Sequence, residues 1–357
     1  SILILISSTL FAQPESIWTK TYGGAAFERG WALDELENGD FIVVGEKDYD
    51  LWLLKMDTNG DTLWSKTYGG ESEDVGRSVV QTTDGGFIIA GESSSFYNGQ
   101  HLWLIKTDAA GDSVWSVLYG APQLSFAGYS AIQTTDGNYV VIGFTTIDSA
   151  NQEVDILLLK IDSDGNLIWT QTYGGIEGER GWDVIETSDG GFVLTGWTES
   201  FGISTNHDAW LIKTDALGNE IWNKTYGGDN DQYQGWVVNQ TSDGGFIFAG
   251  DTEKFGSGRK SDLLLIKTDD SGDTTWTKTY GGLLDDSGYS VHQTDDAGFV
   301  ISGNTWSYGS GEADAWLIKT DVDGELEWDK TFGDSGYNTC DFGQISMDGN
   351  YIFTGHK

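Results

Sequence analysis

The chain has 357 residues, with 50 glycines, two prolines and 13% aromatic residues, a composition that suits tight hairpins around a packed core rather than a disordered tail. Its formal net charge of −37 repels phosphate backbones and anionic lipids, so nucleic acid is excluded as a partner, whereas neutral ligands and calcium are compatible. The single cysteine, Cys340, excludes an internal disulfide and any multi-cysteine metal site.

Residues 1–12 form a short apolar run that ends in a small residue, as the core and cleavage end of a secretory signal peptide do. A charged start and an initiator Met are missing. We therefore expect a signal-peptide remnant at 1–12, truncated at the front, and a secreted or cell-surface protein. The alternative for this run is an ordinary buried strand. The run is too short to span a bilayer and no other stretch is long and apolar enough, so we expect no membrane insertion.

One phrase, Trp-x-Lys-Thr-Tyr-Gly-Gly, organises the rest of the chain. It occurs at residues 18–24 and 64–70, and it returns, altered in some copies, at the later tryptophans Trp115, Trp169, Trp222, Trp276 and Trp328. The repeat is about 50 residues long, which is typical of propeller blades and similar repeat architectures.

Each repeat contains two hairpins. In the second unit we expect strands at 76–81, 87–91, 102–108 and 114–119, joined by turns that contain Asp and Gly. No stretch of the repeats has a helical period. The pattern predicts an all-β fold, a seven-bladed β-propeller of four-stranded antiparallel blades. A parallel β-helix needs much shorter coils, and tandem sandwiches need longer units with linkers.

We expect one propeller domain over residues 13–357, with blades at approximately 25–70, 71–121, 122–175, 176–228, 229–282 and 283–333, and a last blade made of 334–357 plus 15–24. The sequence contains seven copies of the first hairpin and six copies of the second hairpin. The last blade is therefore predicted to be incomplete, without its third strand and closed by the N-terminal strand. Either a gap remains there or residues 17–22 slide inward to pair with 351–355. We also expect the natural protein to continue past Lys357.

The repeated polar residues have structural explanations. Period two puts Trp64, Lys66 and Tyr68 on one face of the outer strand, where the Lys stem can lie between the two rings. A second lysine precedes each Asp-x-x-Gly turn by two residues and is expected to pair with the turn aspartate; this set is Lys55, Lys106, Lys160, Lys213, Lys267 and Lys319. The turn aspartate could bind calcium, but an Asp that caps its own turn explains it better.

The units resemble the secreted bacterial β-propeller repeat, because Tyr-Gly-Gly is followed by a polar stretch and by Asp-Gly-Gly-Phe-Ile-x-x-Gly. The resemblance covers residues 15–357. It implies a secreted or surface protein of the kind that carries a C-terminal type IX secretion sorting domain, which this chain lacks. The Asp-x-x-Gly-x-x-x-Trp turn is similar to scaffold motifs of PQQ-type propellers and sialidases, and implies no catalytic residue.

Departures from the repeat are the candidate site residues. Arg29, Arg77 and Arg180 lie beside the glycine of an inner strand in three blades and could hold a carboxylate, or they could pair locally with Glu28, Asp74 and Glu179. Glu28, Asp74, Glu179 and Asp286 could form a cation site or be solvated charges. Phe96, Phe201, Phe255 and Tyr308 could stack on sugars or pack over the blade edge. We assign no catalytic or cofactor-binding residue, and His101, His207, His292 and His356 have no ligand spacing.

These observations favour a monomeric binding propeller that recognises a glycan or another surface protein through its variable loop face, with no cofactor and with calcium as a compatible ion. A glycosidase- or lyase-type enzyme that uses the same face is the alternative, and a structural spacer is a third reading.

Overall fold

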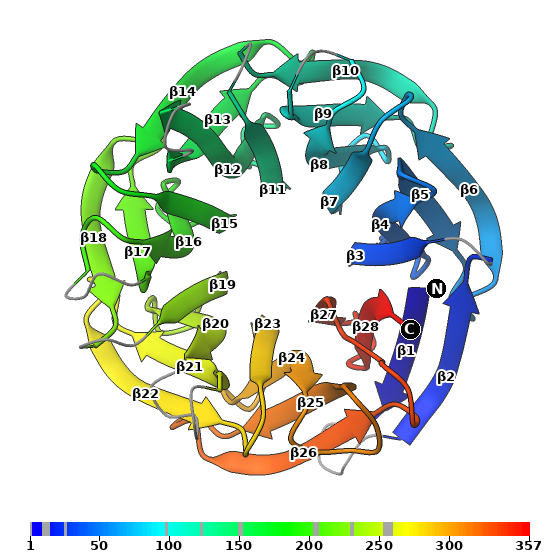
Figure 1. Ribbon diagram of the computed structural model, residues 1–357, viewed down its shortest axis with the longest axis vertical. Helices are drawn as coiled ribbons and strands as arrows, with labels where there is room; N and C mark the ends of the chain where they lie inside the picture. The colour runs from blue at the N-terminus through cyan, green and yellow to red at the C-terminus, as the bar shows by residue number, and fades with distance from the viewer. Residues whose placement is uncertain are drawn as a thin grey trace.

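The computed structural model describes residues 2–8, 15–24, 27–96, 99–121, 124–148, 153–202, 207–228, 232–252 and 260–357. These residues contain 28 strands, which form seven four-stranded antiparallel sheets arranged in a ring around an axis (Figure 1). The described part of the chain has no helix, and hence none that could cross a membrane.

Six blades are continuous in sequence, and in each the first strand lies nearest the axis and the fourth lies on the rim (Figure 1). Their strands are β3 (Glu28–Glu35), β4 (Phe41–Lys47), β5 (Asp50–Met56) and β6 (Thr62–Tyr68); β7 (Asp74–Gln81), β8 (Phe87–Ser93), β9 (His101–Thr107) and β10 (Ser113–Tyr119); β11 (Phe126–Gln133), β12 (Tyr139–Asp148), β13 (Glu153–Ile161) and β14 (Leu167–Tyr173); β15 (Glu179–Glu186), β16 (Phe192–Thr198), β17 (Asp208–Thr214) and β18 (Glu220–Tyr226); β19 (Tyr233–Gln240), β20 (Phe246–Thr252), β21 (Asp262–Thr268) and β22 (Thr274–Tyr280); and β23 (Asp286–Gln293), β24 (Phe299–Thr305), β25 (Asp314–Thr320) and β26 (Leu326–Phe332).

The remaining sheet is composite and corrects the predicted fold class. From the axis outward it consists of β27 (Phe342–Ile345), β28 (Tyr351–His356), β1 (Ile2–Ser8) and β2 (Glu15–Tyr22). Strand β1 pairs with β28 from Ile2↔His356 to Ser7↔Tyr351, and β2 pairs with β1. The prediction of an incomplete last blade is therefore wrong, and so is the prediction that residues 17–22 close the ring directly against 351–355.

The physical reason lies in the apolar run at the start of the chain. The third strand of a blade is covered by neighbours on both faces, so an uninterrupted apolar sequence suits it. Residues 2–6 have that sequence, and the strand they begin, β1, occupies the third place, which is the ordinary-strand alternative to the predicted signal-peptide remnant.

The core lies between neighbouring blades. Every residue of β8 and of β9 is buried, as expected for strands that are apolar on both faces. One buried cluster, for example, joins Ile42, Val44 and Leu53 of one blade to Phe87 and Ile89 of the next. Each blade is thus held mainly by its neighbours.

The repeated outer-strand phrase also connects blades. The ring of Trp64 lies 6.1 Å from that of Phe87 in the next blade. Tyr68 donates its hydroxyl proton to the carbonyl of Gly111, and Lys66 forms an ion pair with Asp112, all in the next blade. The same ring contact occurs at seven interfaces: Trp18–Phe41, Trp64–Phe87, Trp115–Tyr139, Trp169–Phe192, Trp222–Phe246, Trp276–Phe299 and Trp328–Tyr351.

The buried lysines do not pair with the predicted aspartates. Lys106 lies 2.9 Å from Asp84 in the first hairpin turn, whereas Asp108, the predicted partner, accepts the backbone N–H groups of Ala110 and Asp112 within its own turn. The antiparallel register places the Lys side chain beside the preceding turn rather than the following one. The equivalent pairs are Lys55–Asp40, Lys160–Asp136, Lys213–Asp189, Lys267–Asp243 and Lys319–Asp296.

Candidate axial binding site

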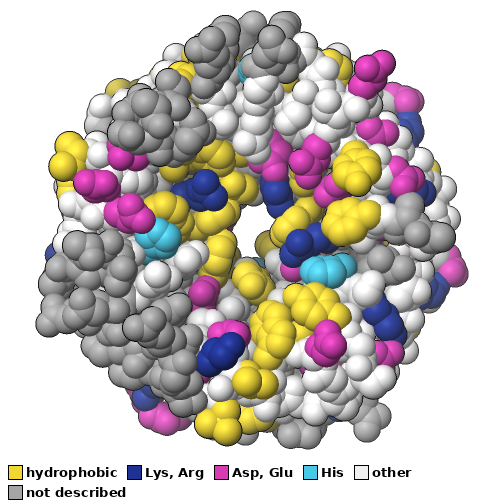
Figure 2. Space-filling model, in the orientation of Figure 1, with side chains coloured by type: hydrophobic (Ala, Val, Ile, Leu, Met, Phe, Trp, Pro, Cys, Tyr) yellow, Lys and Arg dark blue, Asp and Glu magenta, His cyan; other side chains and the backbone are white. Residues whose placement is uncertain are grey.

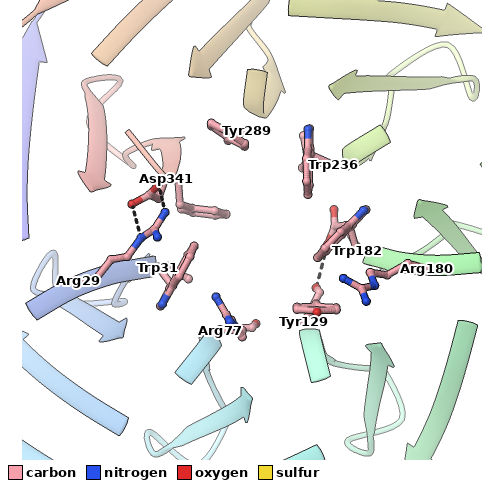
Figure 3. Close-up of a pocket in the computed structure, with 15 residues that line it drawn as sticks. Arg29, Trp31, Arg77, Tyr129, Arg180, Trp182, Trp236, Tyr289 and Asp341 are labelled. Atoms are coloured by element: carbon pink, nitrogen blue, oxygen red, sulfur yellow. Dashed lines mark hydrogen bonds and ion pairs between the residues drawn. The ribbon is translucent and has the colours of Figure 1, made fainter. Parts of the chain in front are cut away.

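A β-bulge in the inner strands builds the site. In β3 the pairing with β4 shifts between Gly30 and Ala32, so Trp31 has no partner in the ladder. A bulge of this kind re-aims a side chain. The same shift follows the corresponding glycine in six blades, and the unpaired residues are Trp31, Arg77, Tyr129, Trp182, Trp236 and Tyr289. Figure 3 shows these six side chains converging on the axis from their different blades.

The converging side chains line a cavity of about 520 Å³ at the centre of the ring. Figure 2 shows the hollow from one face, with hydrophobic and basic side chains gathered around it. Three of the four arginines of the chain, Arg29, Arg77 and Arg180, lie in its wall. The structure therefore brings the three predicted arginines into one pocket, although they come from three blades.

Two of these arginines are neutralised by the protein, though not by the residues weighed from the sequence. Arg29 donates to Asp341 from Nε at 3.3 Å and from Nη2 at 3.0 Å, and its guanidinium stacks 3.5 Å from the Trp31 ring centre. Arg77 donates to Glu92 at 2.6 Å and lies 4.2 Å from the same indole ring. Local pairing with Glu28 and Asp74 is therefore wrong.

Arg180 is different. Its guanidinium lies 4.6 Å from the ring centre of Phe144 and 5.6 Å from that of Trp182. Among the described residues it has no ion pair, and its buried Nε–H has no acceptor. Pairing with Glu179 is not found. Arg180 is thus held by aromatic faces and keeps its charge unmatched.

Beside Arg180, an aromatic ladder forms the wall of the pocket across four neighbouring blades. Ring centres are 4.4 Å apart for Tyr129 and Trp182, 4.6 Å for Trp182 and Trp236, and 5.8 Å for Trp236 and Tyr289. We did not select these residues from the sequence. A signal is present in the sequence, because each of them directly follows the glycine at the third position of an inner strand.

Two carboxylates line the pocket. Asp183 accepts from Ser130 Oγ at 2.8 Å and from the backbone N–H of Val238 at 3.1 Å, and desolvation raises its pKa to about 6. Asp341 lies between Arg29 and His356, whose Nδ1 is 2.9 Å away. The contact between Asp341 and His356 could not be expected from the sequence, since it depends on how the composite blade closes.

The predicted cation ring has a structural role. Glu28, Asp74, Glu179 and Asp286 are buried, so the expectation of solvated charges is wrong. Each accepts the N–H of the second glycine of the preceding phrase, which fixes the chain as it crosses between blades; the donors are Gly24, Gly70, Gly175 and Gly282. Within the described ranges, no group of three or more His, Cys, Asp or Glu residues could hold a metal ion.

The loop aromatics lie away from the pocket lining. Phe96, Phe201 and Tyr308 are about half exposed and pack against Trp103, Trp210 and Trp316, with ring centres 5.4, 5.1 and 5.5 Å apart. These contacts correspond to packing over the blade edge. The fourth candidate, Phe255, lies outside the described residues.

The chain was compared with known proteins. No family model matches it, and no curated protein matches it in sequence. Solved structures match in fold over most of both chains. The periplasmic gluconolactonase of Pseudomonas aeruginosa is 11% identical, with 95% of this chain and 98% of that chain covered and a TM-score of 0.56. The Pan2 WD40 domain of Neurospora crassa is 10% identical, with 91% and 88% covered and a TM-score of 0.55.

An ulvan lyase of polysaccharide lyase family PL25, solved with the saccharide GlcA(1-4)Rha3S, is 10% identical, with 84% and 82% covered and a TM-score of 0.57. Among these similar structures are enzymes and a WD40 domain, so the fold is compatible with catalysis or with binding. At such identities the likeness shows the architecture only: this chain has the β-propeller fold.

Proposed function

We propose that the protein is a secreted or cell-surface binding module that holds a saccharide in the axial pocket. One observation carries the proposal: aromatic faces from neighbouring blades and three guanidinium groups surround a single cavity of about 520 Å³. Cavities of this size hold small ligands, and rigid aromatic faces offer contact area at a low entropic cost. A secreted location is supported by the resemblance of the repeats, and the module is proposed to act as a monomer.

The state of the pocket carboxylates favours binding over glycoside hydrolysis. Most glycosidases use a pair of carboxyl groups, which attack the sugar, activate a water molecule or exchange a proton with the leaving oxygen. Both oxygens of Asp183 are engaged by Ser130 and Val238, and both oxygens of Asp341 by Arg29 and His356. Both carboxylates thus serve as hydrogen-bond acceptors for the protein's own groups.

Two of the similar structures have names that refer to sugar chemistry, a gluconolactonase and an ulvan lyase. They lend support to a carbohydrate ligand for a pocket at the axis, while the aromatic ladder of this chain is the stronger argument. A protein partner remains the second candidate named from the sequence, and no feature of the pocket favours it.

Binding of oligosaccharides to the purified protein tests the proposal, on a glycan array and then by calorimetry, with and without calcium. We expect one class of saccharide to bind, and Trp182→Ala to weaken it at least about tenfold, or 1.4 kcal/mol. The control is Tyr49→Asn, which changes an aromatic outside the pocket that is 65% exposed and has a φ of 71°, an angle that Asn tolerates. A protein that binds no saccharide would rule the proposal out.

A further inference from the structure

We infer that the ligand carries a carboxylate attached to a sugar ring, as a hexuronic acid does, and that Arg180 is its anchor. This inference rests on the proposed function and adds the chemical class of the ligand. It starts from the difference between Arg180 and the other two arginines of the pocket.

Charge pairing singles out Arg180. Arg29 and Arg77 have carboxylate partners at 3.0 and 2.6 Å, so an incoming anion would have to compete with Asp341 and Glu92. Arg180 has no such competitor among the described residues. In a chain with a net charge of −37, an unpaired guanidinium inside a pocket is the position where an anion gains most.

Hydrogen bonding indicates the same ligand chemistry. Within the described part of the chain, four buried N–H groups of pocket residues have no acceptor: Trp31 Nε1, Arg77 Nε, Arg180 Nε and Trp182 Nε1. A buried donor without a partner is unfavourable. The wall of the pocket is therefore rich in donors, and a carboxylate supplies acceptor oxygens in the planar arrangement that an arginine fork matches.

The position of Arg180 beside the aromatic ladder indicates that the carboxylate belongs to a sugar ring. Its guanidinium lies 5.6 Å from the Trp182 ring centre, and Trp182 continues the ladder to Trp236 at 4.6 Å. Figure 3 shows Arg180 next to Trp182 and Tyr129. In a hexuronic acid the carboxylate is bonded directly to the pyranose ring. A ring that stacks on the ladder therefore brings its carboxylate to Arg180 without a spacer.

The part of the ligand that the pocket holds is small. A cavity of about 520 Å³ belongs to the range of pockets that hold small ligands, and the rest of the protein repels anions. The pocket thus fits one or two uronate residues, for example at a chain end, and a long polyanion gains nothing from the outer surface.

Calorimetry with matched saccharides tests the inference on the wild-type protein. The probes are a digalacturonate, its methyl ester, the neutral digalactose and a sulfated digalactose. We expect the digalacturonate to bind at least about tenfold more tightly than the ester and the neutral sugar. Equal affinity for the charged and neutral sugars overturns the carboxylate anchor but leaves the proposed function standing. A preference for the sulfated sugar overturns the carboxylate class. No binding by any probe in this set or on the array overturns both proposals.

Variants locate the anchor. Arg180→Gln should reduce the preference for digalacturonate over its ester to less than about threefold, and Arg180→Lys should restore part of it. Lys224→Gln removes the same charge on the rim, where Lys224 pairs with Asp273, and should leave the preference unchanged. Thermal unfolding checks that each variant is folded. An unchanged preference in folded Arg180→Gln assigns the anion to another group and refutes the anchor.

Discussion

The indole of Trp18 meets the ring of Phe41 edge-on, with ring centres 6.4 Å apart and planes at 63°. This contact joins the rim strand of the composite blade to the first continuous blade. Tyr22 adds a hydrogen bond to the carbonyl of Gly60 across the same interface. The two ends of the chain are therefore held in one ring by the tryptophan contact that recurs at every blade interface and by a tyrosine hydrogen bond that recurs at five other interfaces.

Removal of residues 1–8 distinguishes a strand from a targeting segment. Without β1, strand β2 loses its ladder with β1 and β28 loses one of its two neighbours. We expect a lower melting temperature and faster proteolysis near both termini, measured by calorimetry and by limited digestion. A chain that lacks Ser1 alone is the control. Unchanged stability after removal of residues 1–8 would mean that this segment does not belong to the sheet.

The interblade contact of the outer-strand tryptophan predicts a stability effect. Trp64→Ala should lower the free energy of unfolding by about 2–4 kcal/mol, somewhat less than for a fully buried large aromatic, because Trp64 is only half buried. Denaturant titration measures the change. A loss below about 1 kcal/mol would contradict the role of this ring in joining blades.

Substitution of two glycines in one blade distinguishes the cost of a steric clash from the cost of backbone strain. Gly85 and Gly111 have φ angles of 81° and 78°, so Ala is strained at both, by about 1 kcal/mol. A Cβ on Gly85 would meet nothing within 4 Å, whereas one on Gly111 would lie 2.8 Å from the Trp64 ring. Gly111→Ala should therefore destabilise the protein more than Gly85→Ala in the same denaturant titration. Equal losses would show that the ring moves aside freely.

Stability should depend on pH with a maximum between neutral and strongly acidic conditions. Burial and neighbouring carboxylates raise the pKa of Asp155 and Asp262 to about 6, so their ionised forms oppose folding and stability rises as pH falls from 7 toward 5. The Lys106 and Thr82 contacts bring the pKa of Asp84 to about 2 against the effect of burial, so the stability from this pair is lost as pH falls from about 4 to 2.

Melting temperatures from pH 7 to pH 2 test this profile. Asp155→Asn and Asp262→Asn should each flatten the rise between pH 7 and pH 5, because the neutral amide cannot take up a proton. Asp164→Asn, at an exposed turn position, serves as the control. A melting temperature that falls steadily below pH 7 would contradict the assignment of the raised pKa values.

Loop aromatics provide a contrast to the pocket. Tyr308 packs on Trp316 and donates its hydroxyl proton to the carbonyl of Gly281 at 2.6 Å. We expect Tyr308→Phe to lose the hydrogen bond, at a cost of about 1 kcal/mol, without any change in saccharide affinity. Calorimetry on the two proteins decides. Weaker binding by this variant would mean that the saccharide also contacts the loop aromatics.

The sequence allowed most of the blade structure to be predicted, because local signals determine it. Strands expected at 76–81, 87–91, 102–108 and 114–119 correspond to β7, β8, β9 and β10 within two residues at each end. Contacts between distant segments were less accessible. An apolar run is compatible with a signal-peptide core and with a strand that is covered on both faces. The hairpin count indicated that the last blade needs a third strand, but no local signal shows that residues 2–8 supply it.

The site was only partly predictable for a similar reason. Three arginines departed visibly from the repeat, and the structure brings them together. Trp182 and Trp236 were overlooked because an aromatic residue within a strand is usually part of a core. The bulge turns these residues toward the axis, and the glycine before each of them is its one local sign in the sequence. The partner of Lys106 was missed because register between strands, not sequence distance, decides which carboxylate is near.

The inner-strand bulge has a consequence for how such a protein can change over time. Its residue, such as Trp236, is outside the ladder that pairs β19 with β20, so a replacement there leaves the sheet's hydrogen bonds in place. Each continuous blade contributes one such position, and Arg77 already differs from its aromatic counterparts. Single mutations at these positions can therefore alter the chemistry of the pocket one wall at a time, while the scaffold that the rest of the repeat specifies stays as it is.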